Sequence, residues 1–298
     1  MLAFSHNKRA CGVTRAGNRF FAAQLEQQAG ALNVRNALTG TTNDLEDRAR
    51  LRRLLSSCPC YAAVSKVDEQ ENVIIRPIVI PAASTSKIKI AVHTQMEEHI
   101  HYSDYVLTYG MRERQVVAGN APGPSTGLDV IAVSVPKNAL KEEKDWWLAL
   151  KLPLPTLSVY ALSGPNLFTR LGNTSFRDVL LISANLWGVG GVDFVLLRDC
   201  SLVYHRWVAI SLDAEEEQRL SSEIEQTHLY IHKTFACDPA ICLPPMTMTP
   251  LLPGYNTITF NPLEHAQMRY ASEDIKTCCL ENQARAHLAI GLAMNGLS

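Results

Sequence analysis

The chain has 298 residues, of which 47% are hydrophobic and 19% are charged, and its formal net charge is −1. This composition supplies enough apolar surface for a sizeable core and excludes a strongly charged polyelectrolyte. No run of about 18 residues is apolar and free of charge, and the first residues lack the order of a signal peptide. We therefore expect a cytoplasmic protein with no membrane partner, whose eight cysteines are reduced thiols.

The first region, residues 1–60, reads as a helical and basic segment. Residues 20–38 contain good helix formers interrupted by Gly30, and a clearer helix starts at Asn43, which makes a capping-box pattern with Glu46. Residues 1–53 hold nine basic and four acidic residues, a net charge of +5. Four arginines of the expected helix are candidates for contact with nucleic acid or an acidic partner, the alternative being a solvated helix surface. These are Arg48, Arg50, Arg52 and Arg53.

The second region, residues 61–210, is rich in expected strands. Residues 72–80 are dense in β-branched side chains, and residues 87–93 alternate with period two, which predicts a strand with one solvated face. Because few helices separate the strands, this region favours a mixed or antiparallel sheet over a doubly wound parallel one. Further strands are expected at 102–109, 128–135, 157–162, 178–183, 192–197 and 202–210.

The third region, residues 211–298, is expected to be helical with a Pro-rich loop. Asp213 and Glu216 make a second capping box, and an apolar stripe follows as far as Phe235. Ser272 is the expected cap of the last helix. The fold class is therefore α+β, a central sheet region flanked by N-terminal and C-terminal helices, with one domain containing all three regions as the alternative. No internal repeat is recognisable.

Two groups of residues have the types and spacing of metal ligands. The first would hold zinc, because thiolates shortly after two histidines on one helix face complete a tetrahedral site; the alternative is a histidine satisfied within the core. The second contains His99-Ile100-His101, which on a strand would send both rings to the same side, and it resembles the cupin pattern, although the glycine expected before the histidine pair is absent. The first group is His228, His232, Cys237 and Cys242. The second group is His93, His99, His101 and Asp104.

Other chemical signals are weak or missing. Cys58 and Cys60 flank one proline, a spacing that strains a disulfide, so we expect reduced thiols. Asp193 and Asp199 could share a metal with other acids. The chain contains no phosphate-binding loop of the Gly-x4-Gly-Lys type, no Gly-x-Gly-x-x-Gly, no Gly-x-Ser-x-Gly and no His-Glu-x-x-His.

The leading hypothesis is a structural or assembly protein, most concretely a virus capsid subunit or a subunit of another large particle, and not an enzyme. It depends on the missing catalytic motifs, the basic first region and the long Pro-rich segment 243–261. Its partners would be other protein subunits, with nucleic acid as a further partner of the basic region, and a viral chain would reside in the host cytoplasm and the virion. No cofactor is expected, zinc excepted. The alternatives are a metal-dependent, cupin-like enzyme and a nucleic-acid-binding module.

Overall fold

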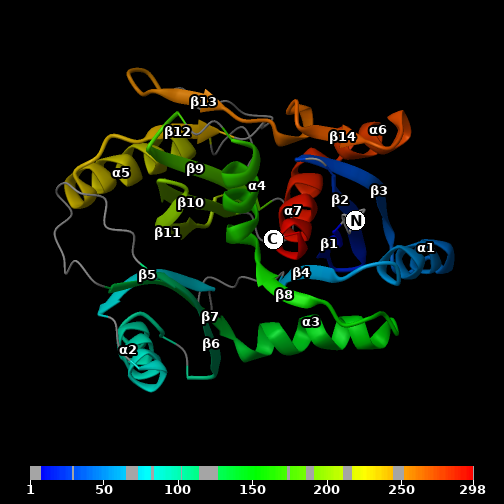
Figure 1. Cartoon of the computed structure of the whole chain (residues 1–298), viewed down its shortest axis with the longest axis horizontal. Helices are drawn as coiled ribbons and strands as arrows, with labels where there is room; N and C mark the ends of the chain where they lie inside the picture. The colour runs from blue at the N-terminus through cyan, green and yellow to red at the C-terminus, as the bar shows by residue number, and fades with distance from the viewer. Residues whose placement is uncertain are drawn as a thin grey trace, which may run out of the picture.

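Three β-sheets with helices around them make up the structure, a computed structural model (Figure 1). It describes residues 8–28, 30–64, 73–81, 84–101, 103–113, 127–172, 175–185, 191–210, 217–243 and 252–297. The expected mixture of helices and strands is confirmed, whereas the expected arrangement of flanking helices around one sheet region is not. Within the described residues, no helix is both long and apolar enough to cross a membrane.

The first sheet combines an antiparallel meander with parallel strands at both of its edges. Its strands lie in the order β14 (Met268–Tyr270), β3 (Ala31–Thr41), β2 (Arg19–Gln28), β1 (Arg9–Ala16), β4 (Cys60–Val64) and β8 (Thr156–Val159). β1, β2 and β3 pair antiparallel, β4 pairs parallel to β1, and β8 pairs parallel to β4. The helix α1 (Leu45–Leu55) connects β3 to β4.

The second sheet repeats this topology. Its strands lie in the order β11 (Ser201–Val208), β10 (Gly191–Arg198), β9 (Asp178–Asn185), β12 (Ala240–Leu243) and β13 (Thr257–Thr259). β9, β10 and β11 pair antiparallel, the helix α5 (Glu217–Phe235) follows, and β12 and β13 are parallel to β9. The chain is therefore built from two halves of equal topology, a structural repeat that its amino-acid sequence does not reveal.

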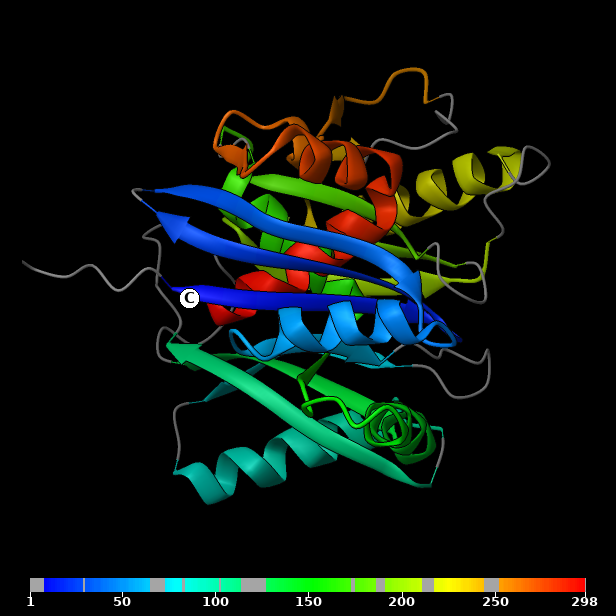
Figure 2. The same ribbon diagram turned by 90° about the vertical axis from the view of Figure 1, so that its right-hand side faces the viewer.

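A third, smaller sheet is inserted in the first half between β4 and β8. It contains β5 (Ile74–Pro81), β7 (Gly127–Pro136) and β6 (Tyr105–Glu113) in that spatial order, all antiparallel. The helix α2 (Thr85–Glu97) connects β5 to β6, and α3 (Lys137–Ala149) leads back toward β8. Figure 2 shows this inserted unit below the first sheet, with α2 at the bottom.

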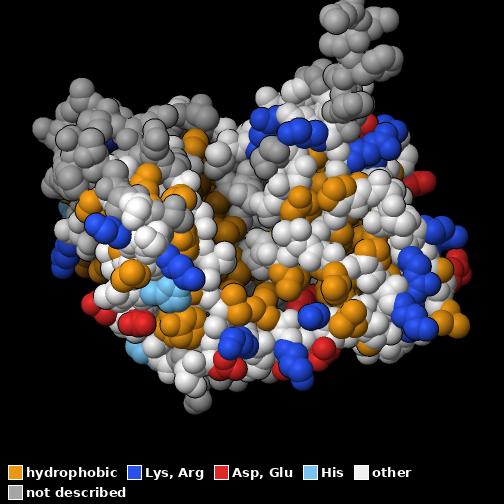
Figure 3. Space-filling view, turned by 60° about the horizontal axis from the view of Figure 1, so that its bottom comes forward, with side chains coloured by type: hydrophobic (Ala, Val, Ile, Leu, Met, Phe, Trp, Pro, Cys, Tyr) orange, Lys and Arg blue, Asp and Glu red, His pale blue; other side chains and the backbone are white. Residues whose placement is uncertain are grey.

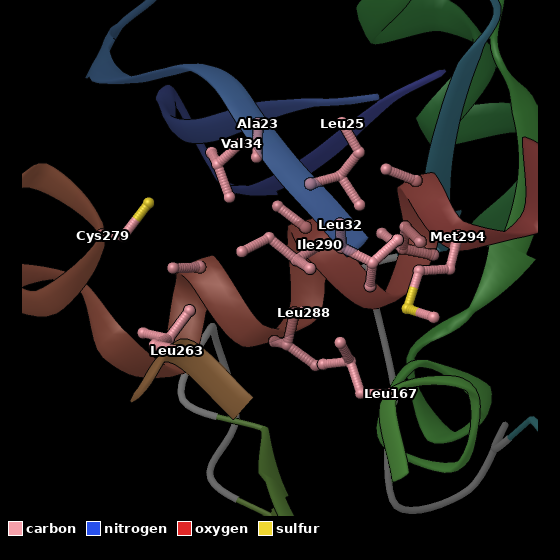
Figure 4. Packing of buried hydrophobic residues seen from close by; sticks show 14 of the residues in the cluster. Ala23, Leu25, Leu32, Val34, Leu167, Leu263, Cys279, Leu288, Ile290 and Met294 are labelled. Atoms are coloured by element: carbon pink, nitrogen blue, oxygen red, sulfur yellow. The ribbon is translucent and has the colours of Figure 1, made fainter. Parts of the chain in front are cut away.

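Two helices lie between the halves and hold them together. The helix α4 (Ser163–Leu171) leaves the first sheet and packs on the second, where Phe168 lies among Val179 and Leu181. The C-terminal helix α7 (Gln283–Ala293) packs against β1 and β2 of the first sheet, as Figure 4 shows for Ile290 beside the strand residues. The approach is very close, because a Cβ atom on Gly12 of β1 would lie 1.8 Å from the carbonyl oxygen of Ala289.

The expectation of helix in residues 20–38 is wrong, because these residues form β2 and β3. β2 is buried on both faces. Phe20 and Ala22 pack with the residues of α1, whereas Phe21, Ala23 and Leu25 pack with those of α7. A strand covered on both sides carries a continuous apolar run, which periodicity alone does not distinguish from a buried helix.

The strand expected at 87–93 is also wrong, because these residues belong to α2. Ile88, Val92 and Met96 are buried and lie four residues apart, which is a helical stripe, whereas Ile90 is 67% exposed. Apolar residues that alternate with period two also include residues four apart, so the pattern that indicated a strand matches the helical spacing of Ile88 and Val92 as well. Two helix starts were close to correct: Asp44 rather than Asn43 caps α1, and Ser272 caps α6 (Glu273–Glu281) as expected.

Candidate functional site

A small cavity lies where the three sheets meet. The parallel strands β1, β4 and β8 all end at this edge of the first sheet, and ligands of open α/β sheets bind at the carboxyl ends of such strands. The cavity measures about 30 Å³, room for one or two water molecules, among the described residues. Its lining is mostly apolar and consists of Val64, Val73, Ile75, Val159, Tyr160, Ala161, Asp193, His205 and Trp207.

One buried hydrogen-bonded pair lines the cavity from the second half. His205 Nε2 lies 2.8 Å from Asp193 Oδ1, and the two side chains are only 5% and 9% exposed. The β10–β11 hairpin brings them together, because Asp193 is opposite Trp207 and His205 is opposite Val195, which makes the two residues diagonal neighbours on one face. Arg76 of β5 donates to the carbonyl oxygen of His205 at 3.3 Å and so ties the inserted unit to this hairpin.

An ion pair between Arg15 and Glu143 lies in the first half of the chain. Arg15, at the end of β1, donates through Nε to Glu143 Oε2 of α3 at 2.9 Å, and Trp147 donates to the other carboxylate oxygen at 2.9 Å. The Arg15 guanidinium also lies over the ring of Trp146, 4.8 Å from its centroid. Burial, together with the nearby Glu143 carboxylate, raises the pKa of Tyr160, so its phenol stays protonated.

These contacts define what the site can do. Asp193, which lines the cavity, is buried and hydrogen-bonded to His205, and Glu143 of α3 is buried and paired with Arg15. Ligating a divalent ion through either carboxylate would require breaking its pair, and breaking a buried salt bridge by removing one partner costs about 3–5 kcal/mol. Both pairs also tie elements of the fold together, β10 to β11 and β1 to α3.

The candidate arginines of α1 do not form one site. Arg48 donates to the carbonyl oxygen of Thr42 at 2.6 Å, Arg50 lies 3.6 Å from Asp47, and Arg52 donates to the carbonyl oxygen of Leu150 at 3.0 Å. α1 covers the face of the first sheet opposite α7 (Figure 2). Contact of these arginines, Arg53 included, with a partner stays a prediction.

The expected zinc ligands have separate partners. His228 Nε2 lies 3.0 Å from Asp238, Cys237 interacts with Arg198, and Cys242 is fully buried in β12. His232 is exposed on α5. Among the described residues, no three His, Cys, Asp or Glu side chains gather where one metal ion could bind.

The histidines expected on a strand lie on and after α2. His93 is in the helix, while His99 and His101 follow it and are exposed. Asp104 pairs with Lys137 at 2.5 Å. Asp199 lies 3.5 Å from Arg177, away from Asp193. The capping residues Asp213 and Glu216 lie outside the described residues, as do residues 244–251 of the Pro-rich loop.

The comparisons with known proteins identify the fold. No protein-family model matches the chain, and no curated protein matches it. A chain of the structure "PilM-PilN type IV pilus biogenesis complex" matches with a TM-score of 0.69 at 15% identity, over 97% of this chain and 98% of that chain. This chain shares the fold of that protein.

Other solved structures match less well. A protein of Bacteroides thetaiotaomicron described with an "actin-like ATPase fold and unknown function" has a TM-score of 0.44 at 10% identity, over 88% of this chain and 95% of that one. An inorganic polyphosphate/ATP-glucomannokinase of Arthrobacter has a TM-score of 0.43 at 12% identity, over 98% and 99%.

The interpretation as a capsid or virion subunit is wrong, because the fold is that of the PilM–PilN chain. The cupin-like enzyme loses its basis, because α2 lies where it needed a strand. The nucleic-acid-binding module rested on the arginines of α1, whose contact with a partner stays a prediction. Sequence reasoning also missed the Asp193–His205 and Arg15–Glu143 pairs. The signal available for them was charged residues within dense apolar strands, such as Asp193 between Val192 and Phe194.

Proposed function

We propose that this chain is a docking subunit, which uses an actin-like ATPase fold to hold a segment of a partner protein and does not turn over nucleotide. The observation that carries the proposal is that two buried carboxylates already have partners, Asp193 of the cavity lining with His205 and Glu143 of α3 with Arg15. The shared fold of the PilM–PilN chain, which belongs to a complex of proteins, supports the docking half of the proposal.

Exposed apolar side chains mark the surface on which a partner would dock. Six of the nine large exposed hydrophobic residues in the described chain lie in or directly after the inserted unit: Val79, Ile90, Val106, Met111, Leu148 and Leu154. Figure 3 brings this side of the molecule forward and shows apolar side chains spread over it. Apolar surface of this kind, surrounded by polar residues, is typical of protein-interaction sites.

The end of α3 is the part of this surface that we expect a partner to contact. Leu148 is 50% exposed and Leu154 is 54% exposed, on either side of the turn at Lys151. Arg52 reaches the same turn from α1, where it donates to the carbonyl oxygen of Leu150. An apolar segment with an acidic neighbour fits this combination of leucines and a guanidinium.

A second candidate function is binding of a nucleotide or another phosphoryl ligand. It is favoured by the position of the cavity at the strand ends and by the sequence Gly188-Val189-Gly190-Gly191, whose last residue begins β10. Gly191 packs against Trp207 of the cavity lining. Glycine-rich segments can present backbone N–H groups to a phosphate. Calorimetric titration of the full chain with ATP, with and without Mg²⁺, tests this function.

Selection of random displayed peptides on the full chain tests the docking proposal. Enriched peptides should contain apolar residues beside an acid, and Leu148→Asp or Leu154→Asp should weaken their binding about tenfold or more. Leu45→Asp is the matched control, because Leu45 is 76% exposed on α1 and should be neutral. Failure to enrich peptides, or equal binding to all three variants, would refute docking at this surface.

A further inference from the structure

Three cysteines come together on the face of the first sheet that α1 covers. Cys11 of β1 is opposite Cys60 of β4, and Cys58 lies just before that strand. The sulfur atoms of Cys11 and Cys58 are 2.9 Å apart, although 47 residues separate them in the chain. The backbone N–H of Cys11 donates to the carbonyl oxygen of Pro59 at 2.8 Å, which fixes the two segments relative to each other.

The two close cysteines have different surroundings. Cys11 is fully buried, and its thiol lies 3.6 Å from the carbonyl oxygen of Leu54. Cys58 is half-buried, next to the exposed Ser57, and Gln24 Nε2 donates to its sulfur at 3.5 Å. The hydrogen bond from Cys11 lowers the pKa of Cys58 to about 6, and it raises the pKa of Cys11. Cys58 is thus the accessible thiolate, and Cys11 supplies a second sulfur.

We propose that Cys58 is an oxidant-reactive thiol and that Cys11 captures its oxidised form as an intramolecular disulfide. The oxidant class is a peroxide. The Cys58 thiolate attacks one peroxide oxygen, the O–O bond breaks with loss of hydroxide, and two electrons leave the sulfur to give a sulfenic acid. Cys11 then attacks the Cys58 sulfur. The S–S bond forms, the S–O bond breaks, and the hydroxyl group leaves as water with the proton of Cys11.

Cys11, rather than Cys60, is the expected second sulfur. The two sulfurs need to approach by only about 0.9 Å to reach the disulfide bond length of roughly 2.05 Å. Cys58 and Cys60 are separated by Pro59 alone, a spacing that strains a disulfide. Cys60 is also buried, and burial raises the pKa of its thiol.

The expected reactivity can be worked out for pH 6. Near that pH about half of Cys58 is thiolate, against roughly one part in a thousand for a thiol at the ordinary pKa of 9.0. A thiolate of low pKa is a weaker nucleophile, by about 25-fold when the pKa values of the two thiols differ by three. Cys58 should therefore react with peroxide roughly 20-fold faster than an ordinary exposed thiol.

Mass spectrometry of the full chain after treatment with hydrogen peroxide at pH 6 tests the proposal. Trypsin releases peptide 10–15, with Cys11, and peptide 54–66, with Cys58 and Cys60; the proposal predicts that these become disulfide-linked. The link should persist in Cys60→Ser and disappear in Cys58→Ser. In Cys11→Ser, a sulfenic-acid trap should label Cys58.

The exposed Cys200 is the control thiol. A link through Cys60, a link between two molecules, or oxidation of Cys58 no faster than of Cys200 would each overturn the proposal. Circular dichroism of every variant shows whether it is folded. Should Cys11→Ser not fold, the pH dependence of Cys58 alkylation in the unmodified chain decides the same question, with a midpoint near 6 expected and one near 9 contradicting it.

Discussion

Replacement of Gly12 by alanine tests the contact that holds the C-terminal helix on the first sheet. The added Cβ would lie 1.8 Å from the carbonyl oxygen of Ala289 and 2.8 Å from the backbone nitrogen of Ala293. Both neighbours are backbone atoms of α7, so neither can rotate away, and the helix must recede by more than 1 Å to restore an ordinary contact of at least 3.4 Å. Overpacking of a core costs about 1–3 kcal/mol, and we expect about 3 kcal/mol or more here.

Urea denaturation followed by circular dichroism measures this loss, provided that the slope of the transition is unchanged. Gly110→Ala is the matched control, because Gly110 also lies in a strand and nothing is within 4 Å of an added Cβ. That variant should change stability by no more than about 0.5 kcal/mol. A cost below about 1 kcal/mol for Gly12→Ala would refute the close packing of α7 on β1.

Three other predictions concern stability. Glu143→Ala leaves Arg15 and the Trp147 N–H without their carboxylate, so urea denaturation should show a loss of about 3–5 kcal/mol in the free energy of unfolding. Lys141→Ala, at an exposed pair on the same helix, is the control and should cost less than about 1 kcal/mol. Equal costs for the two variants would contradict the role of Glu143. His287 has an Nε2 screened from water and without a partner among the described residues, and burial lowers its pKa to about 4 from 6.5. As the pH falls, His287 therefore binds its proton in the unfolded chain before it does so in the folded chain, and the free energy of unfolding should fall by about 1–3 kcal/mol between pH 6.5 and 4. His287→Leu should remove that part of the pH dependence. An unchanged pH dependence would show that His287 does not titrate this way. Val92→Lys should destabilise the protein because Val92 is buried, whereas Ile90→Lys should not because Ile90 is exposed. The reverse order of effects would indicate a strand at 87–93 instead of α2.

Local pattern predicted α5, which has one solvated and one buried face. The stripe Leu220, Ile224, Thr227 and Ile231 of α5 is buried as its spacing indicates. β2 failed because helices cover both its faces, which removes the alternation that identifies a strand. The repeat of the two halves was invisible because it resides in strand order and direction, which many different apolar sequences satisfy.

The candidate site was hidden for a different reason. Arg15 and Glu143 are 128 residues apart, and the cavity forms only when the inserted unit and the second half meet the first sheet. Asp193 and His205 are 12 residues apart, but their meeting depends on the register of a hairpin. Cys58 was noted only for its spacing from Cys60, as an ordinary reduced thiol, and its partner Cys11, 47 residues away, was not noted. Spacing along the chain therefore identified residue types and missed their partners.

Phosphate release from ATP by the full chain, in the presence of Mg²⁺, is the measurement that most directly tests whether this fold serves docking instead of turnover. Asp193→Asn and Glu143→Gln are measured beside the unmodified chain, because they alter the two buried, paired carboxylates while keeping their size. We expect no release above the buffer background from any of the three proteins. Release by the unmodified chain that either variant abolishes would contradict the account, because it would show one of these carboxylates acting in catalysis.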